Sequence, residues 1–137
     1  MIQHKQLILN GFIGKPFTKQ YQAKKFLNNL VDVIGMKKII EPVAKYVHSP
    51  GNRGMTAAIL IETSHIAFHI WDEENPAKIR FDLYTCGDLD VRKVIDFIEL
   101  HLVFWEPPLW LLLDRAFTKR FQVEDSSGGQ ILMVDNA

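Results

Sequence analysis

The sequence is poor in cysteine and has no excess of charge of either sign. Cys86 is the single cysteine among 137 residues, which excludes a disulfide within the chain and favours a reducing compartment such as the cytoplasm. The 16 basic residues balance the 16 acidic residues. The overall charge therefore gives no electrostatic reason to expect nucleic acid or an anionic membrane as a partner.

The sequence also lacks a long hydrophobic run. Its most apolar stretch, LVFWEPPLWLLL, contains Glu106 and two prolines, and is too short and too broken to cross a bilayer. The first 15 residues lack the apolar region and the cleavage site of a signal peptide. With 47% hydrophobic residues and no linker-like segment, residues 1–137 are predicted to form one globular domain that contacts no membrane.

Periodic patterns predict two helices and several strands. Apolar residues recur every three or four positions over residues 19–35 and 90–102, which is typical of amphipathic helices. Gly35 suits the end of the first helix, and Asp88 or Asp90 suits the start of the second. Strands are predicted over residues 5–13, 37–47, 55–62, 64–71 and 78–85. Pro42 favours an edge position for the second of these strands.

The C-terminal part has a weaker pattern. The segment WLLLDRAF fits a helix or a strand, FTKRFQVE fits a last strand, and SSGGQ fits a flexible tail. The short connections between residues 55 and 85 favour hairpins, and therefore an antiparallel sheet rather than a parallel, doubly wound one. Two amphipathic helices on one face of such a sheet predict an α+β fold, a two-layer α/β sandwich.

The predicted strand SHIAFHIW has two different faces. Ile66, Phe68 and Ile70 form a core face, whereas His65 and His69 lie on the other face. On a helix the two histidines could share a zinc ion, but on a strand they lie roughly 13 Å apart, which no single metal spans. The sequence has no other cluster with ligand spacing, so we predict no metal site.

Two further residues have more than one interpretation from pattern alone. Ser64 lies outside any G-x-S-x-G motif, so an α/β-hydrolase interpretation fails. A cysteine before glycine at a strand end, as at Cys86, is most often a small buried hydrophobe, but a thiol in a partly open setting can be reactive.

Taken together, LIETSHIAFHIWDE and FDLYTCGD resemble the bacterial and archaeal S-adenosylmethionine decarboxylase proenzyme family. Its members carry a segment close to E-S-H-I-x-I-H-T-W-P-E and then a strand that ends in F-T-C-G. The matches to the first segment are Ser64, His65, Ile66, His69, Trp71 and Glu73. The matches to the second are Asp82, Thr85, Cys86 and Gly87. The family's G-x-[ST]-G run corresponds to Gly54-Met55-Thr56-Ala57, and the likeness covers roughly residues 5–103.

The resemblance implies that the chain cuts itself between Thr63 and Ser64. In this family the serine hydroxyl attacks the preceding carbonyl, and β-elimination divides the chain, here into a β chain of residues 1–63 and an α chain of residues 64–137. Ser64 would become a covalent pyruvoyl group. Its ketone forms a Schiff base with the amine of S-adenosylmethionine and accepts the electrons released with carbon dioxide. The implied product is the aminopropyl donor for spermidine.

The resemblance also implies a role for individual residues. His69 would be the base that promotes elimination, Thr56 would hydrogen-bond the processing intermediate, and Cys86 would protonate the product carbon. His48 and Glu73 would contact the substrate. The family further implies a homodimer. The segment FWEPPLWLLL could supply apolar surface for such a contact, or it could pack on the sheet of its own chain.

The sequence departs from the family pattern next to the serine. Thr63 stands where members usually carry glutamate, and the connections around DEENPAKIR and HSPGNRGMT are longer than usual. Two alternatives follow from these departures. One is a pyruvoyl-dependent decarboxylase of a basic amino acid, ornithine or arginine. The other is a non-processing, non-catalytic relative that binds a ligand or a partner.

Overall fold

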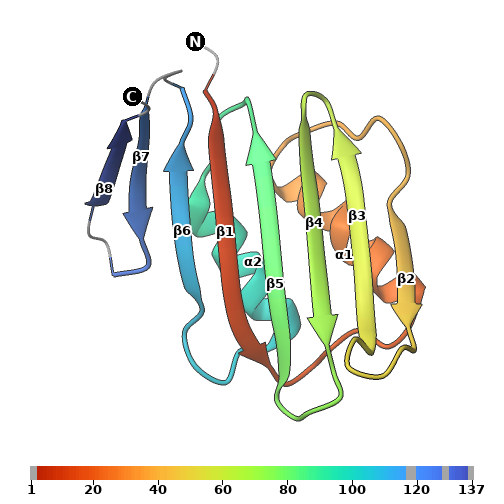
Figure 1. The fold of residues 1–137 in the computed structure, drawn as a ribbon. Helices are drawn as coiled ribbons and strands as arrows, with labels where there is room; N and C mark the ends of the chain where they lie inside the picture. The colour runs from red at the N-terminus through yellow and green to blue at the C-terminus, as the bar shows by residue number, and fades with distance from the viewer. Residues whose placement is uncertain (1–2, 117–119, 128–129, 136–137) are drawn as a thin grey trace.

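One antiparallel sheet forms the framework of the protein (Figure 1). The computed structural model describes residues 3–116, 120–127 and 130–135. The strands are β1 (Lys5–Ile13), β2 (Val43–Val47), β3 (Gly54–Ile61), β4 (Ser64–Trp71), β5 (Ala77–Thr85), β6 (Leu109–Asp114), β7 (Arg120–Asp125) and β8 (Gln130–Asp135). Their order across the sheet is β2-β3-β4-β5-β1-β6-β7-β8. β1 therefore lies in the middle of the sheet, between β5 and β6.

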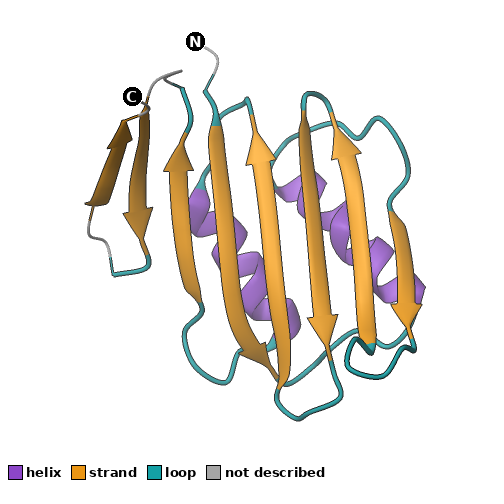
Figure 2. Cartoon of the chain, viewed as in Figure 1, coloured by secondary structure: helices purple, strands orange, loops and turns teal. Residues whose placement is uncertain are grey.

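Two helices cover one face of this sheet, and no described helix covers the other (Figure 2). They are α1 (Gln20–Val33) and α2 (Val91–Leu102). This arrangement confirms the predicted α+β sandwich with both helices on one side. We call the uncovered side the open face of the sheet.

Local sequence signals set the helix ends. The side-chain oxygen of Gln22 accepts hydrogen bonds from the backbone N–H groups of Thr18 and Lys19 at 3.0 and 3.1 Å, which satisfies donors at the start of α1. Gly35, with φ of 69°, follows the end of α1 as predicted. Asp90 caps α2 by accepting a hydrogen bond from the backbone N–H of Lys93, so Asp90 rather than Asp88 is the N-cap.

The core lies between the sheet and the helices. Alternate residues of β4, namely Ile66, Phe68 and Ile70, are at most 2% exposed, as their spacing predicts. The apolar stripes of both helices belong to the same core cluster through the residues Ala23, Phe26, Leu27, Leu30, Val31, Val94, Ile95, Ile98 and Leu102. Burial of this apolar surface is the main favourable term in folding.

The second predicted strand is shorter than expected. The pattern predicts residues 37–47, but β2 begins only at Val43. Pro42 has no backbone N–H to donate, and before it the chain makes only an isolated bridge between Lys38 and Ile61. The edge position that Pro42 favours is confirmed, since β2 is the first strand of the sheet.

The C-terminal part contains more strand than the sequence analysis predicts. WLLLDRAF, which fits helix or strand, forms β6 over Leu109–Asp114. FTKRFQVE is not the last strand: its described part belongs to β7, and β8 follows. The prediction of a flexible tail over SSGGQ is wrong for Gln130, which begins β8, while residues 117–119 and 128–129 lie outside the described residues.

Within the described part of the chain, neither α1 nor α2 is long and apolar enough to cross a membrane.

Candidate active site

Ser64 is the first residue of β4 and is only 7% exposed. It directly follows the two-residue turn that joins β3 to β4. Its Oγ accepts a hydrogen bond from the backbone N–H of Cys86, with an N–O distance of 3.3 Å. Two residues that come from separate sequence motifs therefore meet, because β4 and β5 are neighbours in the sheet.

Thr63 has an unusual backbone conformation beside Ser64. Its φ of 54° lies in the left-handed region, which β-branched residues rarely occupy. Its hydroxyl donates a hydrogen bond to the carbonyl oxygen of Glu62 at 2.7 Å and is also hydrogen-bonded to Sγ of Cys86. The residue whose carbonyl would be attacked is thus strained, directly precedes the predicted nucleophile and contacts the predicted acid.

Cys86 lies just after β5 and carries a free, half-buried thiol. Its carbonyl oxygen accepts a hydrogen bond from the backbone N–H of Gln3 at 3.0 Å. The next residue, Gly87, donates its backbone N–H to Oγ1 of the fully buried Thr85 at 2.9 Å. These bonds fix the loop that holds the thiol. The thiol is half-buried, so Cys86 is not a fully buried hydrophobe, and its reactivity stays a prediction.

An open pocket of about 470 Å³ lies at Ser64. Its lining residues come from β3, β4, β5, the β3–β4 turn, the segment before β2 and the segment after β6: Ile39, Leu60, Ile61, Thr63, Ser64, His65, Tyr84 and Arg115. The pocket gives a small molecule access to the point where β4 begins.

Thr56 and His69 form a second group of predicted site residues on the open face. They are cross-strand partners on β3 and β4, and Oγ1 of Thr56 lies 3.1 Å from Nδ1 of His69. His69 follows Ser64 by five residues on the same strand, which places their α-carbons roughly 16 Å apart at about 3.3 Å per residue. An odd separation also puts the two side chains on opposite faces. A single chain therefore does not bring His69 to Ser64.

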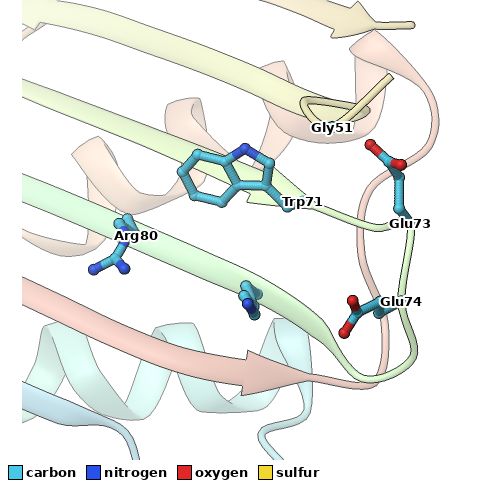
Figure 3. A pocket seen from close by; sticks show the side chains of 6 residues that line it. Gly51, Trp71, Glu73, Glu74 and Arg80 are labelled. Carbon is cyan, nitrogen blue, oxygen red and sulfur yellow. The ribbon is translucent and has the colours of Figure 1, made fainter. Parts of the chain in front are cut away.

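A second pocket, of about 390 Å³, lies beside His69 (Figure 3). The rings of His69 and Trp71 lie 6.0 Å apart, and Arg80 is the cross-strand partner of His69. Figure 3 shows Trp71 and Arg80 on neighbouring strands, with Glu73 and Glu74 in the turn that follows β4. This pocket combines a large aromatic ring with two carboxylates, a guanidinium and the ammonium group of Lys78.

The two residues expected to contact substrate lie at this same end of β4. Glu73 lines the pocket beside Trp71, and its carboxylate accepts a hydrogen bond from the backbone N–H of Arg53 at 3.1 Å. His48 is exposed after β2, with its ring 5.0 Å from the ring of Tyr46. Neither residue lines the pocket at Ser64.

A network of hydrogen bonds and an ion pair joins Tyr46, Arg53 and Asp72 at this end of the sheet. The hydroxyl of Tyr46 donates to a carboxylate oxygen of Asp72 at 2.7 Å, and Nε of Arg53 donates to the other oxygen at 2.9 Å. The hydrogen bond to Asp72 is the main cause that raises the pKa of Tyr46 above its usual value of 10.0, and burial adds to the effect. The same carboxylate raises the pKa of Arg53. The network ties the edge strand β2 to the end of β4.

Sequence reasoning missed two polar residues of the Ser64 pocket, Tyr84 and Arg115, as well as its apolar lining. The ring of Tyr84 stacks with His65 at 5.6 Å, and the guanidinium of Arg115 lies over the same ring, with Cζ 4.7 Å from its centroid. The alternation of β5 could have placed Tyr84 on the open face. No local signal could have found Arg115, because its position depends on the pairing of β6 with β1.

The described residues contain no group of three or more histidine, cysteine, aspartate or glutamate side chains placed to hold a metal ion.

Comparison with known proteins finds one family. The S-adenosylmethionine decarboxylase family matches residues 9–104. Among curated relatives, an S-adenosylmethionine decarboxylase proenzyme of Clostridium botulinum (strain Hall) is 36% identical over 63 residues, which are 45% of this chain and 53% of the relative. Proenzymes of the same name from Persephonella marina and Sulfurihydrogenibium sp. are 36% and 38% identical over 83 residues, 58% of each chain. The chain thus spans about half the length of the curated relatives it matches.

Proposed function

Because this chain belongs to the S-adenosylmethionine decarboxylase family, we propose that it is a self-processing, pyruvoyl-dependent decarboxylase of S-adenosylmethionine that supplies an aminopropyl donor for spermidine. The observation that carries the proposal is the contact between Ser64 and Cys86, whose N–O distance is 3.3 Å, within the matched region. The pocket at Ser64 and the strained Thr63 support it further.

The first step is cleavage of the chain by its own serine. Oγ of Ser64 adds to the carbonyl carbon of Thr63, and the amide becomes an ester. Removal of the α-proton of Ser64 then expels the Thr63 carboxylate and leaves a dehydroalanine. Its hydrolysis releases ammonia and leaves a pyruvoyl group at the start of the 64–137 chain. The positive φ of Thr63 raises the energy of the uncut chain and so favours this reaction.

The residues present at this position fit a pyruvoyl group. Ser64 is nearly buried, so a ketone formed there would be shielded from bulk water, while the adjoining pocket leaves space for an amine to reach it. A pyruvoyl group supplies a ketone that combines with the substrate amine and takes up the electrons released with carbon dioxide. The backbone N–H of Cys86 donates a hydrogen bond to Ser64, and the thiol of Cys86 can deliver a proton to the product carbon.

A second copy of the chain would complete the site. His69 and Thr56 lie roughly 16 Å along β4 from Ser64, and His69 projects from the open face. If two open faces pack together in antiparallel orientation, the His69 end of one β4 lies over the Ser64 end of the other. Although the side chain of Ser64 lies on the opposite face, His69 then faces the backbone of the partner's Ser64 and can act as the base that removes its α-proton. The pocket beside Trp71 would likewise join the partner's Ser64 pocket and provide Glu73 to the substrate.

Two alternatives rest on specific observations. The carboxylates of Glu73 and Glu74 would also suit the side-chain cation of ornithine or arginine, which keeps a basic amino acid as an alternative substrate. Thr63 in place of the usual glutamate motivates a relative that binds a ligand or partner without cleaving itself.

The test begins with the intact mass of the purified protein under denaturing, reducing conditions. Two fragments that meet between Thr63 and Ser64, with a blocked amino terminus on the second, are the expected result. Carbon dioxide release from labelled S-adenosylmethionine, ornithine and arginine then identifies the substrate. Ser64→Ala should remain a single chain without activity. A wild-type chain that stays whole favours the non-processing alternative, and decarboxylation that survives Ser64→Ala contradicts pyruvoyl chemistry.

Co-expression of two variants tests whether a second copy of the chain supplies His69 to the site. Ser64→Ala and His69→Ala chains are each expected to remain uncut when expressed alone. When they are co-expressed with different tags, the His69→Ala chain should be cut, because its intact Ser64 meets the His69 of the Ser64→Ala partner. Failure of the mixture to cut, although mixed dimers form, would place His69 outside the partner's site.

A further inference from the structure

We propose that Arg115 binds the α-carboxylate of the amino-acid substrate in the pocket at Ser64. This inference rests on the proposed function and names a specificity-determining residue for it. The family match ends at residue 104, so Arg115 lies outside the region that the comparison covers.

Three contacts hold Arg115 in the pocket. Its backbone N–H donates to the carbonyl oxygen of His4 at 2.6 Å, which continues the pairing of β6 with β1. Its Cζ lies 4.7 Å from the centroid of the Tyr84 ring, in a cation–π contact. Its Nη1 donates to the side-chain oxygen of Gln6 at 3.0 Å. The guanidinium is therefore oriented before any ligand arrives.

No carboxylate of the described residues lies within ion-pair distance of Arg115. Asp82 is linked to it only through Gln6, whose amide nitrogen donates to the two carboxylate oxygens at 3.0 and 3.2 Å. A guanidinium has five N–H donors, and Gln6 takes one of them. The remaining donors are available for an anion in the pocket.

The pocket offers groups that can bind both the amine and the carboxylate of an amino acid. Ser64 and Arg115 line the same pocket, and none of its other lining residues is acidic. A substrate that reacts through its α-amine at position 64 carries its carboxylate on the adjoining carbon. The planar guanidinium matches a carboxylate through two parallel hydrogen bonds, a geometry that lysine cannot reproduce. Arg115 thus selects ligands that carry both an amine and a carboxylate on one carbon.

Binding to the uncut chain tests this inference without any decarboxylation. In a Ser64→Ala background, calorimetry compares S-adenosylmethionine with its decarboxylated product, which differs only by the missing carboxylate. Adding Arg115→Ala should weaken S-adenosylmethionine binding by roughly 10- to 100-fold and leave the product unchanged, since hydrogen bonds to charged groups carry energies of that order. Arg115→Lys should give an intermediate loss. Arg92→Ala, on the exposed side of α2, is the matched control and should change neither affinity.

Two results would overturn the inference. One is a Ser64→Ala chain that binds S-adenosylmethionine no more tightly than the product. The other is an equal loss for both ligands in Arg115→Ala, which would mean that Arg115 only supports the pocket wall. Failure of the proposed function is recognised separately, by a wild-type chain that remains uncut or releases no carbon dioxide.

Discussion

At the scale of single residues, the backbone conformation next to Ser64 is as unusual as the side chains around it. Thr63 and Val103 are the two non-glycine residues with positive φ in the described part of the chain, both at 54°. Val103 ends α2, where a left-handed residue is common. Thr63 instead directly precedes the proposed point of cleavage, where cutting the chain would release the strain.

Replacing Thr63 by asparagine, which tolerates the left-handed region well, should stabilise the uncut chain. In the Ser64→Ala background, Thr63→Asn is expected to raise the free energy of unfolding by about 0.5–1 kcal/mol, measured by urea denaturation. Val103→Asn should give a similar gain for the same reason. Glu62→Asn, at an ordinary φ, is the control and should give none. Equal effects at all three positions would show that conformation at Thr63 is not the cause.

Gly54 has a steric role that no other residue can fill. It begins β3 with φ of 145°, and a Cβ there would lie 1.8 Å from the backbone oxygen of Ile70. Gly54→Ala should therefore displace β3 from β4 and cost at least about 3 kcal/mol of stability. Gly35→Ala, where φ is 69° but the space is open, should cost only about 1 kcal/mol. Thermal unfolding of both variants makes the comparison, and similar losses would contradict the steric argument.

At the scale of elements, the sequence predicted a strand or helix correctly where one face of that element is buried and the other is exposed. Ile66, Phe68 and Ile70 alternate with more exposed residues, so β4 and its core face followed directly from the sequence. The sequence of β6 shows no matching contrast between apolar and polar residues. Trp110 and Leu112 pack against the core, but Leu109 and Leu111 on the open face are apolar as well, so the segment shows no period of two.

The candidate site could be predicted in part, because motifs identify residues but not the distances between them. Motifs identified Ser64 and Cys86, and β4–β5 pairing then brought them together. Motifs also identified His69, but only the rise along β4 shows that it is far from Ser64 in one chain. Arg115 could not be found, since its contact with Tyr84 requires β6 to pair with a strand about a hundred residues earlier.

The network that joins β2 to β4 gives a pH dependence. Because Asp72 raises the pKa of Tyr46, the neutral phenol is favoured in the folded chain. The associated stability is complete below the unfolded-state pKa of about 10 and is lost as pH rises through the higher folded-state value. Tyr46→Phe should therefore be less stable than wild type at about pH 8, and the difference should shrink above about pH 10. Urea unfolding across this range measures it, and a constant difference would contradict the assignment.

At the scale of the whole molecule, the helices leave one large sheet face without cover. Large apolar side chains lie on that face at 38–71% exposure: Phe12, Val43, Leu60, Leu109 and Leu111. The Thr56–His69 pair and the pocket beside Trp71 lie on it too. An open face that carries both apolar surface and half of the proposed site suits the proposed second copy of the chain better than bulk water.

A charge placed at the centre of this face should prevent the proposed dimer from forming without unfolding the chain. Ala67 lies in the middle of β4, between Ala58 and Asp82, on the same face as His69. In a single chain, an arginine there can extend into water, but between two packed sheets it would be buried in each copy at a cost of several kcal/mol. Ala67→Arg should therefore be monomeric by sedimentation velocity and remain uncut by intact mass. Leu100→Arg, at a side chain 77% exposed on α2, should stay dimeric and be cut. A monomeric Ala67→Arg chain that still cuts itself would show that one chain supplies every group that processing needs.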